Sequence, residues 1–281
     1  MGALRAPPDP DLISSSLMTP SATISPWLSR IEEAGLNASA PSEQRLFDGW
    51  LVRFNPGKAK RARCVNALAP GHLSLDDKLA QLQAFYRQQD LPLFIRITPF
   101  SEPADLDARL AALGWTMIDD TRVMVCLALE SLHAEPWPGG QTMHEVDGHT
   151  FVEAVGGLRG SPPAQRRAQA QRLAHAPVPY RGVVLRDEHG ELLACAQIAV
   201  EEDMVGLYDV FTAPPARAQG LARRLCALLL MQARDAGARV AYLQVEADNL
   251  PARRAYQRLG FSDAYAYHYR TPGDDAAAPP G

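Results

Sequence analysis

The sequence predicts an α/β protein built from two tandem mixed-sheet domains with flanking helices. Segments with the alternating, β-branched character of strands are followed by segments with the i, i+4, i+7 leucine spacing of amphipathic helices. A shift of 146 positions also aligns residues 71–115 with 217–261 without a gap. A repeat of this length, with strands and helices in the same order, indicates that one fold has been duplicated.

Three features recur in this alignment. The first is the apolar face of a helix, the second is a strand, and the third is a Gly-aromatic pair after a second helix. The matched positions are Leu75, Leu79 and Leu82 with Leu221, Leu225 and Leu228; residues 93–98 with 239–244; and Gly114-Trp115 with Gly260-Phe261. Few residues are identical, so the common order of the elements supports the duplication more than any single match.

A proline-glycine cluster at residues 135–140 follows the strand-like run 123–129 and marks the boundary between the domains. The N-terminal stretch is rich in Pro, Ser and Ala and predicts a mobile leader, and the C-terminal stretch predicts a frayed tail. The expected division is a leader at 1–24, a first domain at 25–136, a second domain at 137–273 and a tail at 274–281.

Composition narrows the function classes. The 281 residues are 47% hydrophobic, which suffices for real cores, and the net charge of −4 disfavours nucleic-acid binding. The absence of a long apolar run or a signal-like N-terminus disfavours the membrane and favours a cytoplasmic protein. The four cysteines and seven histidines show no ligand spacing, so buried free thiols and no metal are predicted.

The most informative segment lies at residues 213–222, between a predicted strand and a predicted helix. Residues 204–212 have strand character, and Pro214-Pro215 must end the strand because proline cannot donate to the ladder. The first-turn N–H groups of the following helix have no intrahelical partner, and Gly220 lets the backbone approach a phosphate. Arg217 and the pair Arg223-Arg224 add positive charge. The segment predicts an anion site, although a simple turn before a surface helix is the alternative.

Two motifs carry a family resemblance. Arg217-x-x-Gly220-x-Ala222 fits a Gln/Arg-x-x-Gly-x-Gly/Ala signature, and residues 249–261 fit Asn-x-x-Ala-x-x-x-Tyr-x-x-x-Gly-Phe. Together they resemble the GNAT superfamily of N-acetyltransferases over roughly residues 180–270. The resemblance implies the GNAT fold and acetyl-CoA as co-substrate.

The resemblance also implies roles for the coenzyme-binding residues. Phe211 and Thr212, on a strand that splays from its neighbour, would hold the pantetheine arm. Asn249 would bond the same arm, cap a helix, or do both. Arg217 and the backbone N–H groups of four residues would hold the pyrophosphate; these four are Gln219, Gly220, Leu221 and Ala222.

For the chemistry, the resemblance places Tyr256 near the sulfur as the general acid, and the alternative is a core tyrosine on a helix face. The general base is Asp209 or Glu246, and the resemblance does not choose between them. Glu201 and Glu202 are weaker candidates, because such a run usually forms a solvated hairpin. The segment 142–177, with helical runs broken at Gly156-Gly157 and at 161–163, would cap the acceptor.

The first copy has lost these features. Its loop, residues 71–76, lacks the arginine and puts Asp76 where an anion would sit, so it is not expected to bind coenzyme A. Residues 46–54 and 63–68 read as strands around a basic turn. Trp50 is expected in the core and Arg53 on a solvated face, with an acceptor pocket that also uses Asn66 as the alternative.

The expected function is an acetyl-CoA-dependent N-acetyltransferase that moves the acetyl group to a small-molecule or peptide amine by direct attack in a ternary complex. The alternative is a non-catalytic acyl-CoA sensor. The loop lacks the Gly-Lys-Ser/Thr ending of a nucleotide-binding P-loop. The chain is expected to be a monomer or a weak dimer, and the sequence does not identify the amine.

Overall fold

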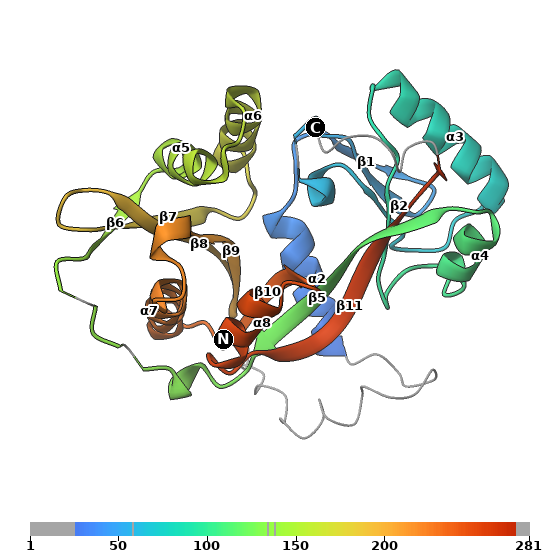
Figure 1. The fold of residues 1–281 in the computed structure, drawn as a ribbon. Coiled ribbons are helices and arrows are strands. Elements are labelled where there is room, and N and C mark those ends of the chain that lie inside the picture. The colour runs from blue at the N-terminus through green and yellow to red at the C-terminus, as the bar shows by residue number, and fades with distance from the viewer. Residues whose placement is uncertain (1–25, 58, 134, 138, 274–281) are drawn as a thin grey trace. The chain divides into compact units, whose positions relative to one another are not determined.

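A computed structural model describes residues 26–57, 59–133, 135–137 and 139–273 (Figure 1). The predicted leader and tail lie outside the described residues. Two compact units are present and both are discontinuous in sequence. The larger unit joins the chain up to Ala38 with Val123–Ala264, and the smaller unit joins Ser39–Arg122 with the chain from Tyr265 onward. The division of the chain into repeated domains at 25–136 and 137–273 stays a prediction.

The larger unit contains a mixed sheet with helices on both faces (Figure 1). Its strand order is β10-β9-β8-β7-β6; β9 and β10 are parallel, and the other pairs are antiparallel. Helices α5 and α6 lie over one face, and α7 lies over the other. The strands are β6 (Thr142–Val146), β7 (Tyr180–Arg186), β8 (Leu192–Glu201), β9 (Met204–Thr212) and β10 (Val240–Glu246). The helices are α2 (Pro26–Ala38), α5 (Gly148–Arg159), α6 (Pro163–Ala174), α7 (Leu221–Asp235) and α8 (Leu250–Gln257).

Alternate residues of the central strands fill two different cores. Val183 and Ala194 belong to the core that includes α7, whereas Val184 and Cys195 pack with Phe151 of α5. Burial on both faces explains why β7 and β8 read as nearly continuous apolar runs. All four cysteines are buried and free, as predicted.

The smaller unit has the strand order β1-β2-β3-β4-β11-β5, with β3 and β4 parallel. Strands β5 and β11 run through both units, because the units divide at Arg122/Val123 and Ala264/Tyr265. The strands are β1 (Gln44–Phe47), β2 (Trp50–Arg53), β3 (Val65–Asn66), β4 (Ile95–Ile97), β5 (Thr116–Cys126) and β11 (Ser262–Thr271); the helices are α3 (Leu75–Gln88) and α4 (Leu106–Ala112). One-turn 3-10 helices occupy Lys60–Ala62, Leu129–Ser131 and Pro214–Ala216.

The element boundaries agree with the 146-residue repeat. Helices α3 and α7 begin at Leu75 and Leu221, and strands β5 and β11 begin at Thr116 and Ser262. Both pairs of starting points are 146 residues apart. In each half, a strand and a short helix lie between these elements, so the order helix, strand, helix, strand recurs.

Two local expectations were wrong in the first half. The predicted strand 46–54 is a hairpin, because Asp48 and Gly49 have φ values of 45° and 83° and form its two-residue turn. Asp-Gly favours this kind of turn, since both central residues need positive φ. Arg53 is not solvated: it is only 1% exposed, and its guanidinium donates to Gln44 and Ser39. Trp50 is in the core, as expected.

The pair Gly156-Gly157 does not break its helix either. Helix α5 continues to Arg159 and ends at Gly160, which has a φ of 66°. Gly156 is instead needed for close packing, because a Cβ there would collide with the Arg166 side chain on α6. A glycine pair can therefore mark a helix contact as well as a helix end.

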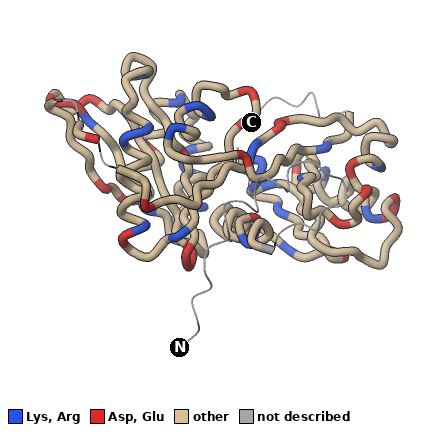
Figure 2. The backbone as a smooth tube through the Cα atoms, turned by 90° about the horizontal axis from the view of Figure 1, so that it is seen from below, with Lys and Arg blue, Asp and Glu red and all other residues tan. Residues whose placement is uncertain are grey.

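The predicted α/β fold with mixed sheets and flanking helices is confirmed. Basic and acidic residues are interspersed along the backbone of both units (Figure 2). Within the described ranges, no helix is long and apolar enough to cross a membrane.

Replacing Gly182 by Ala should lower the free energy of unfolding by about 1–3 kcal/mol, because overpacking a core forces its neighbours to move. A Cβ at this position of β7 would lie 2.7 Å from the ring of the fully buried Phe151. Gly157→Ala is the control. Nothing lies within 4 Å of its Cβ, so this variant should gain up to about 1 kcal/mol of helix propensity. Chemical denaturation measures both, and equal stabilities would contradict the packing.

Candidate functional site

Strands β9 and β10 stop pairing with each other before either strand ends. Their parallel pairing runs from Met204/Val240 to Leu207/Leu243, although β9 continues to Thr212 and β10 to Glu246. Beyond that point β9 still pairs with β8, through Phe211 opposite Cys195. On its other side, this stretch of β9 has no partner among the described strands. Such an edge can accept an extended ligand chain through its backbone polar groups.

A β-bulge occupies the start of this separation. Cys195 pairs with Phe211 and Gln197 with Tyr208, so Asp209 and Val210 face one residue of β8. Asp209 has a φ of 47°, a left-handed conformation that Asp tolerates better than most residues. Bulges end regular pairing and redirect side chains, and here the redirected side chain is a carboxylate.

Three side chains hold the Asp209 carboxylate. Arg159, the last residue of α5, donates to Oδ1 at 2.7 Å. Gln169 of α6 and Gln197 of β8 donate to Oδ2 at 3.0 and 2.7 Å. One guanidinium and two amides therefore engage this carboxylate, and they tie both helices of the 142–177 segment to the bulge.

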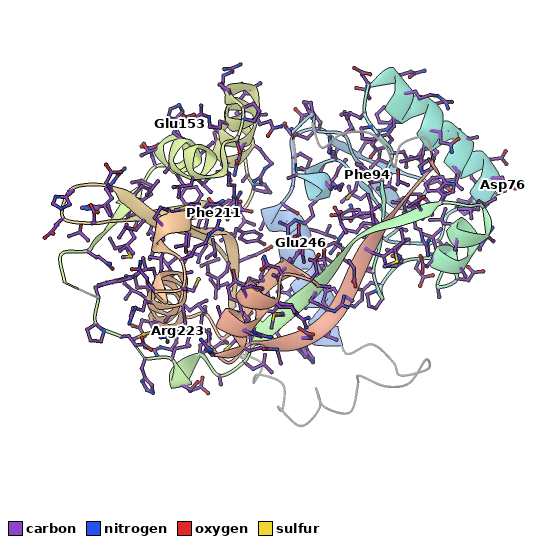
Figure 3. All side chains as sticks on the ribbon, in the orientation of Figure 1. Asp76, Phe94, Glu153, Phe211, Arg223 and Glu246 are labelled. Carbon is purple, nitrogen blue, oxygen red and sulfur yellow. The ribbon has the colours of Figure 1, made fainter. Side chains whose placement is uncertain are left out.

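Two guanidinium groups lie near the ring of Phe211, which Figure 3 labels on β9. The Cζ atoms of Arg159 and Arg217 are 5.4 and 5.6 Å from the ring centroid. Arg217 also donates from Nε to the carbonyl of Thr212 at 3.3 Å. Positive charge thus flanks the part of β9 that leaves β10.

The loop after β9 presents backbone N–H groups at the start of α7. Ala218 and Gly220 both have positive φ, 61° and 74°, and no side chain caps the helix. Alternating backbone conformations of this kind and the positive end of a helix make a concavity suited to an anion. The loop is braced by Arg224, whose Nη1 donates to the carbonyl of Gln219 at 2.9 Å.

Arg223 and Arg224 do not present unpaired charges, contrary to the simplest expectation from the sequence. Both pair with Glu135: Arg223 Nη2 lies 2.6 Å from Oε2, and Arg224 Nε lies 3.2 Å from the same oxygen. The hydrogen bond from Arg223 is the main cause that lowers the pKa of Glu135. Arg217 is therefore the loop arginine that has no carboxylate partner among the described residues.

Tyr256 on α8 is partly buried against the core that includes α7. Its ring centroid lies 6.0 Å from that of Phe261. Burial raises the pKa of the Tyr256 phenol, and the nearby Cys226 raises it further. The hydroxyl therefore stays protonated at neutral pH and can only give up its proton to a stronger base.

The other candidates lie around the separated strands with different surroundings. Glu246 is exposed at the end of β10, and in the described part of the chain no side chain pairs with its carboxylate. Asn249 caps α8, because its Oδ1 accepts from the N–H of Ala252 at 3.2 Å. Glu201 and Glu202 lie at the opposite end of β9 and bond to Asn37 and Arg30 of α2.

Sequence reasoning missed the partners of Asp209. Gln197 had a detectable signal, since it is a polar residue within the apolar run of β8 and is only 1% exposed. Arg159 and Gln169 had none, because arginine and glutamine are ordinary residues on helix surfaces. The coenzyme and catalytic roles of the predicted residues stay predictions.

The matching loop of the smaller unit is filled by an internal carboxylate. Asp48 accepts from the N–H groups of His72 and Leu73 at 2.8 and 3.1 Å. Lys78 lies 2.8 Å from the same carboxylate, and its side chain is 4% exposed. Asp76, the residue expected to block the anion, is exposed to solvent instead. The blocking carboxylate comes from the β1–β2 turn.

The sequence profile of the acetyltransferase (GNAT) family matches residues 141–261, the segment that carries the separated strands, the loop and α8. Residues 141–261 form a GNAT-family acetyltransferase domain. No group of His, Cys, Asp or Glu side chains within the described chain could hold a metal ion.

Other proteins are similar to more of the chain than residues 141–261. The uncharacterized N-acetyltransferase YobR of Bacillus subtilis is 25% identical over 229 residues, 81% of this chain and 91% of the relative. The fold resembles a GCN5-related N-acetyltransferase from Kribbella flavida, with a TM-score of 0.64, 20% identity, and coverage of 87% of this chain and 95% of the other. It also resembles a tandem GNAT protein from the clavulanic acid biosynthesis pathway, with a TM-score of 0.59, 12% identity, and coverage of 74% of each chain. The predicted GNAT fold is confirmed.

Asp48→Asn should destabilise the protein in a pH-dependent way. Hydrogen bonds from the His72 N–H and from the Lys78 ammonium lower the pKa of Asp48 to about 2. A folded pKa below the unfolded one gives stability that is full above about pH 4 and is lost as the pH falls towards 2. The difference in unfolding free energy between wild type and Asp48→Asn should therefore shrink between pH 6 and pH 3. Asp76→Asn, at an exposed position, is the control, and a constant difference for Asp48→Asn would contradict the pairing.

Proposed function

We propose that the larger unit transfers an acetyl group from acetyl-CoA to an amine by direct attack in a ternary complex. The observation that carries this proposal is the gap between β9 and β10 beside the positive-φ loop at the start of α7. The first feature suits an extended thioester arm, and the second suits a pyrophosphate.

The chain has groups that fit each part of the coenzyme. Phe211 and Thr212 would hold the pantetheine arm through the unpaired edge of β9, with Asn249 bonding the same arm from the start of α8. The N–H groups of the loop and the guanidinium of Arg217 would hold the pyrophosphate. When bound, the coenzyme supplies an activated acyl carbon. The loop N–H groups in this assignment belong to Gln219, Gly220, Leu221 and Ala222.

The chemistry needs a base for the amine and an acid for the sulfur. In the transfer, the C–N bond forms, the C–S bond breaks, one proton leaves the amine, and one reaches the thiolate. Tyr256 would give its phenolic proton to the sulfur, and its raised pKa keeps the phenol protonated before the transfer. Glu246 is the better candidate base, acting through water, because the Asp209 carboxylate is already engaged by Arg159 and two amides. Asp209 would then orient the amine.

The rival function is a non-catalytic acyl-CoA sensor that keeps the loop and regulates a partner. Tyr256 favours the enzyme, because a protein that only binds the coenzyme has less need of a protonated phenol near the sulfur. The amine would come from a small molecule or a peptide. The cytoplasmic location and the monomer or weak dimer stay predictions.

Tyr256→Phe should lower kcat for acetyl transfer by about a hundredfold or more, since general acid catalysis contributes on the order of 10²–10⁴. Coenzyme A binding should change little. Tyr86→Phe is the matched control: its hydroxyl donates to the Arg53 carbonyl in the smaller unit, so its loss should affect stability and not kcat. Release of free coenzyme A across a panel of amines measures both variants. Unchanged turnover in Tyr256→Phe would remove this residue from the mechanism.

Gly220→Ala should weaken coenzyme A binding by about tenfold or more, because alanine disfavours the φ of 74° that aims the loop N–H groups. Gly190→Ala is the control. Gly190 has a φ of 83° in the turn between β7 and β8, so it carries the same backbone strain away from the loop. Isothermal titration calorimetry compares the two dissociation constants. If both variants bind like wild type, the loop does not hold the pyrophosphate.

A further inference from the structure

More positively than negatively charged side chains lie around the bulge of β9. Two guanidinium groups, from Arg159 and Arg217, lie near the Phe211 ring, and one carboxylate, from Asp209, pairs with Arg159. In the proposed function, the coenzyme pyrophosphate neutralises Arg217. Arg159 and Asp209 then remain as an ion pair at the bulge where β9 leaves β10, with side chains 35% and 20% exposed.

An amine that approaches Asp209 in its ammonium form finds the carboxylate already paired with Arg159. One carboxylate cannot neutralise two cations, and like charges this close repel. Leaving the partly buried Arg159 guanidinium without its carboxylate partner is also costly. An acceptor with its own carboxylate removes both costs, because Arg159 can turn from Asp209 to that carboxylate in a bidentate pair.

We propose that the acceptor is an amine that carries a nearby carboxylate, as in an α-amino acid, with Asp209 binding the amine and Arg159 binding the carboxylate. This inference rests on the proposed function and specifies its substrate class. It disfavours polycationic acceptors, which would add positive charge beside two arginines. Gln169 and Gln197 keep Asp209 in position during the exchange, since they hold its other oxygen.

The test compares each common L-amino acid with its decarboxylated amine, using release of free coenzyme A from acetyl-CoA. Wild type should prefer the amino acids in kcat/KM. Arg159→Gln should lower kcat/KM for the preferred amino acid by about tenfold to a hundredfold, mainly through KM, as expected for the loss of a charged pair. The decarboxylated amine should be unaffected or improved, because Asp209 is then free to bind it.

Arg166→Gln is the matched control. Arg166 links the same two helices through Glu153 but does not contact Asp209. It should leave the preference for amino acids unchanged. If wild type prefers decarboxylated amines or polyamines, or if Arg159→Gln lowers both classes alike, the assignment of Arg159 is wrong.

A second measurement separates this inference from the proposed function. Calorimetry follows amino-acid binding to protein saturated with coenzyme A, whether or not transfer occurs. Absence of transfer to every amine would contradict the proposed function. Amino-acid binding that is lost in Arg159→Gln would still support the site, whereas no amino-acid binding by wild type would overturn it.

Discussion

The bulge at Asp209 is the constraint on which the site depends. One extra residue between Tyr208 and Phe211 lets β9 stay with β8 while it leaves β10. The same residue turns a carboxylate towards α5 and α6, and three side chains hold it there. The bulge therefore links the separated edge of β9, the helices α5 and α6, and the Arg159 guanidinium near Phe211.

The loops before α3 and α7 occupy matching positions in the repeat but differ in what faces their backbone N–H groups. Both α3 and α7 follow a loop whose backbone N–H groups suit an anion, and the helices begin 146 residues apart. In the smaller unit, the Asp48 carboxylate accepts hydrogen bonds from those N–H groups and forms an ion pair with the buried Lys78. In the larger unit, Ala218 and Gly220 have positive φ, and no side chain caps the start of α7. In the loop before α3, the Asp48 carboxylate thus takes the place that an external anion would need.

The sequence predicted the parts of the fold that depend on local pattern and regular spacing. Strand β9 has the predicted bounds, and the starts of α3 and α7 follow the repeat. The hairpin at Asp48-Gly49 was missed although its turn signal is strong, because the flanking apolar residues read as one strand. The Arg159–Asp209 and Arg223–Glu135 pairs were not predictable, since their partners lie 50 and 88 residues apart and no local pattern marks them.

We infer that the chain holds coenzyme in the larger unit alone. Titration of isotopically labelled protein with coenzyme A, followed by the backbone amide resonances, tests it most directly. We expect saturation at one coenzyme per chain, with shifts at Gln219, Gly220, Leu221 and Ala222 and none at His72 and Leu73. Saturation at two coenzymes with shifts at His72 and Leu73, or binding that leaves the loop before α7 unperturbed, would contradict it.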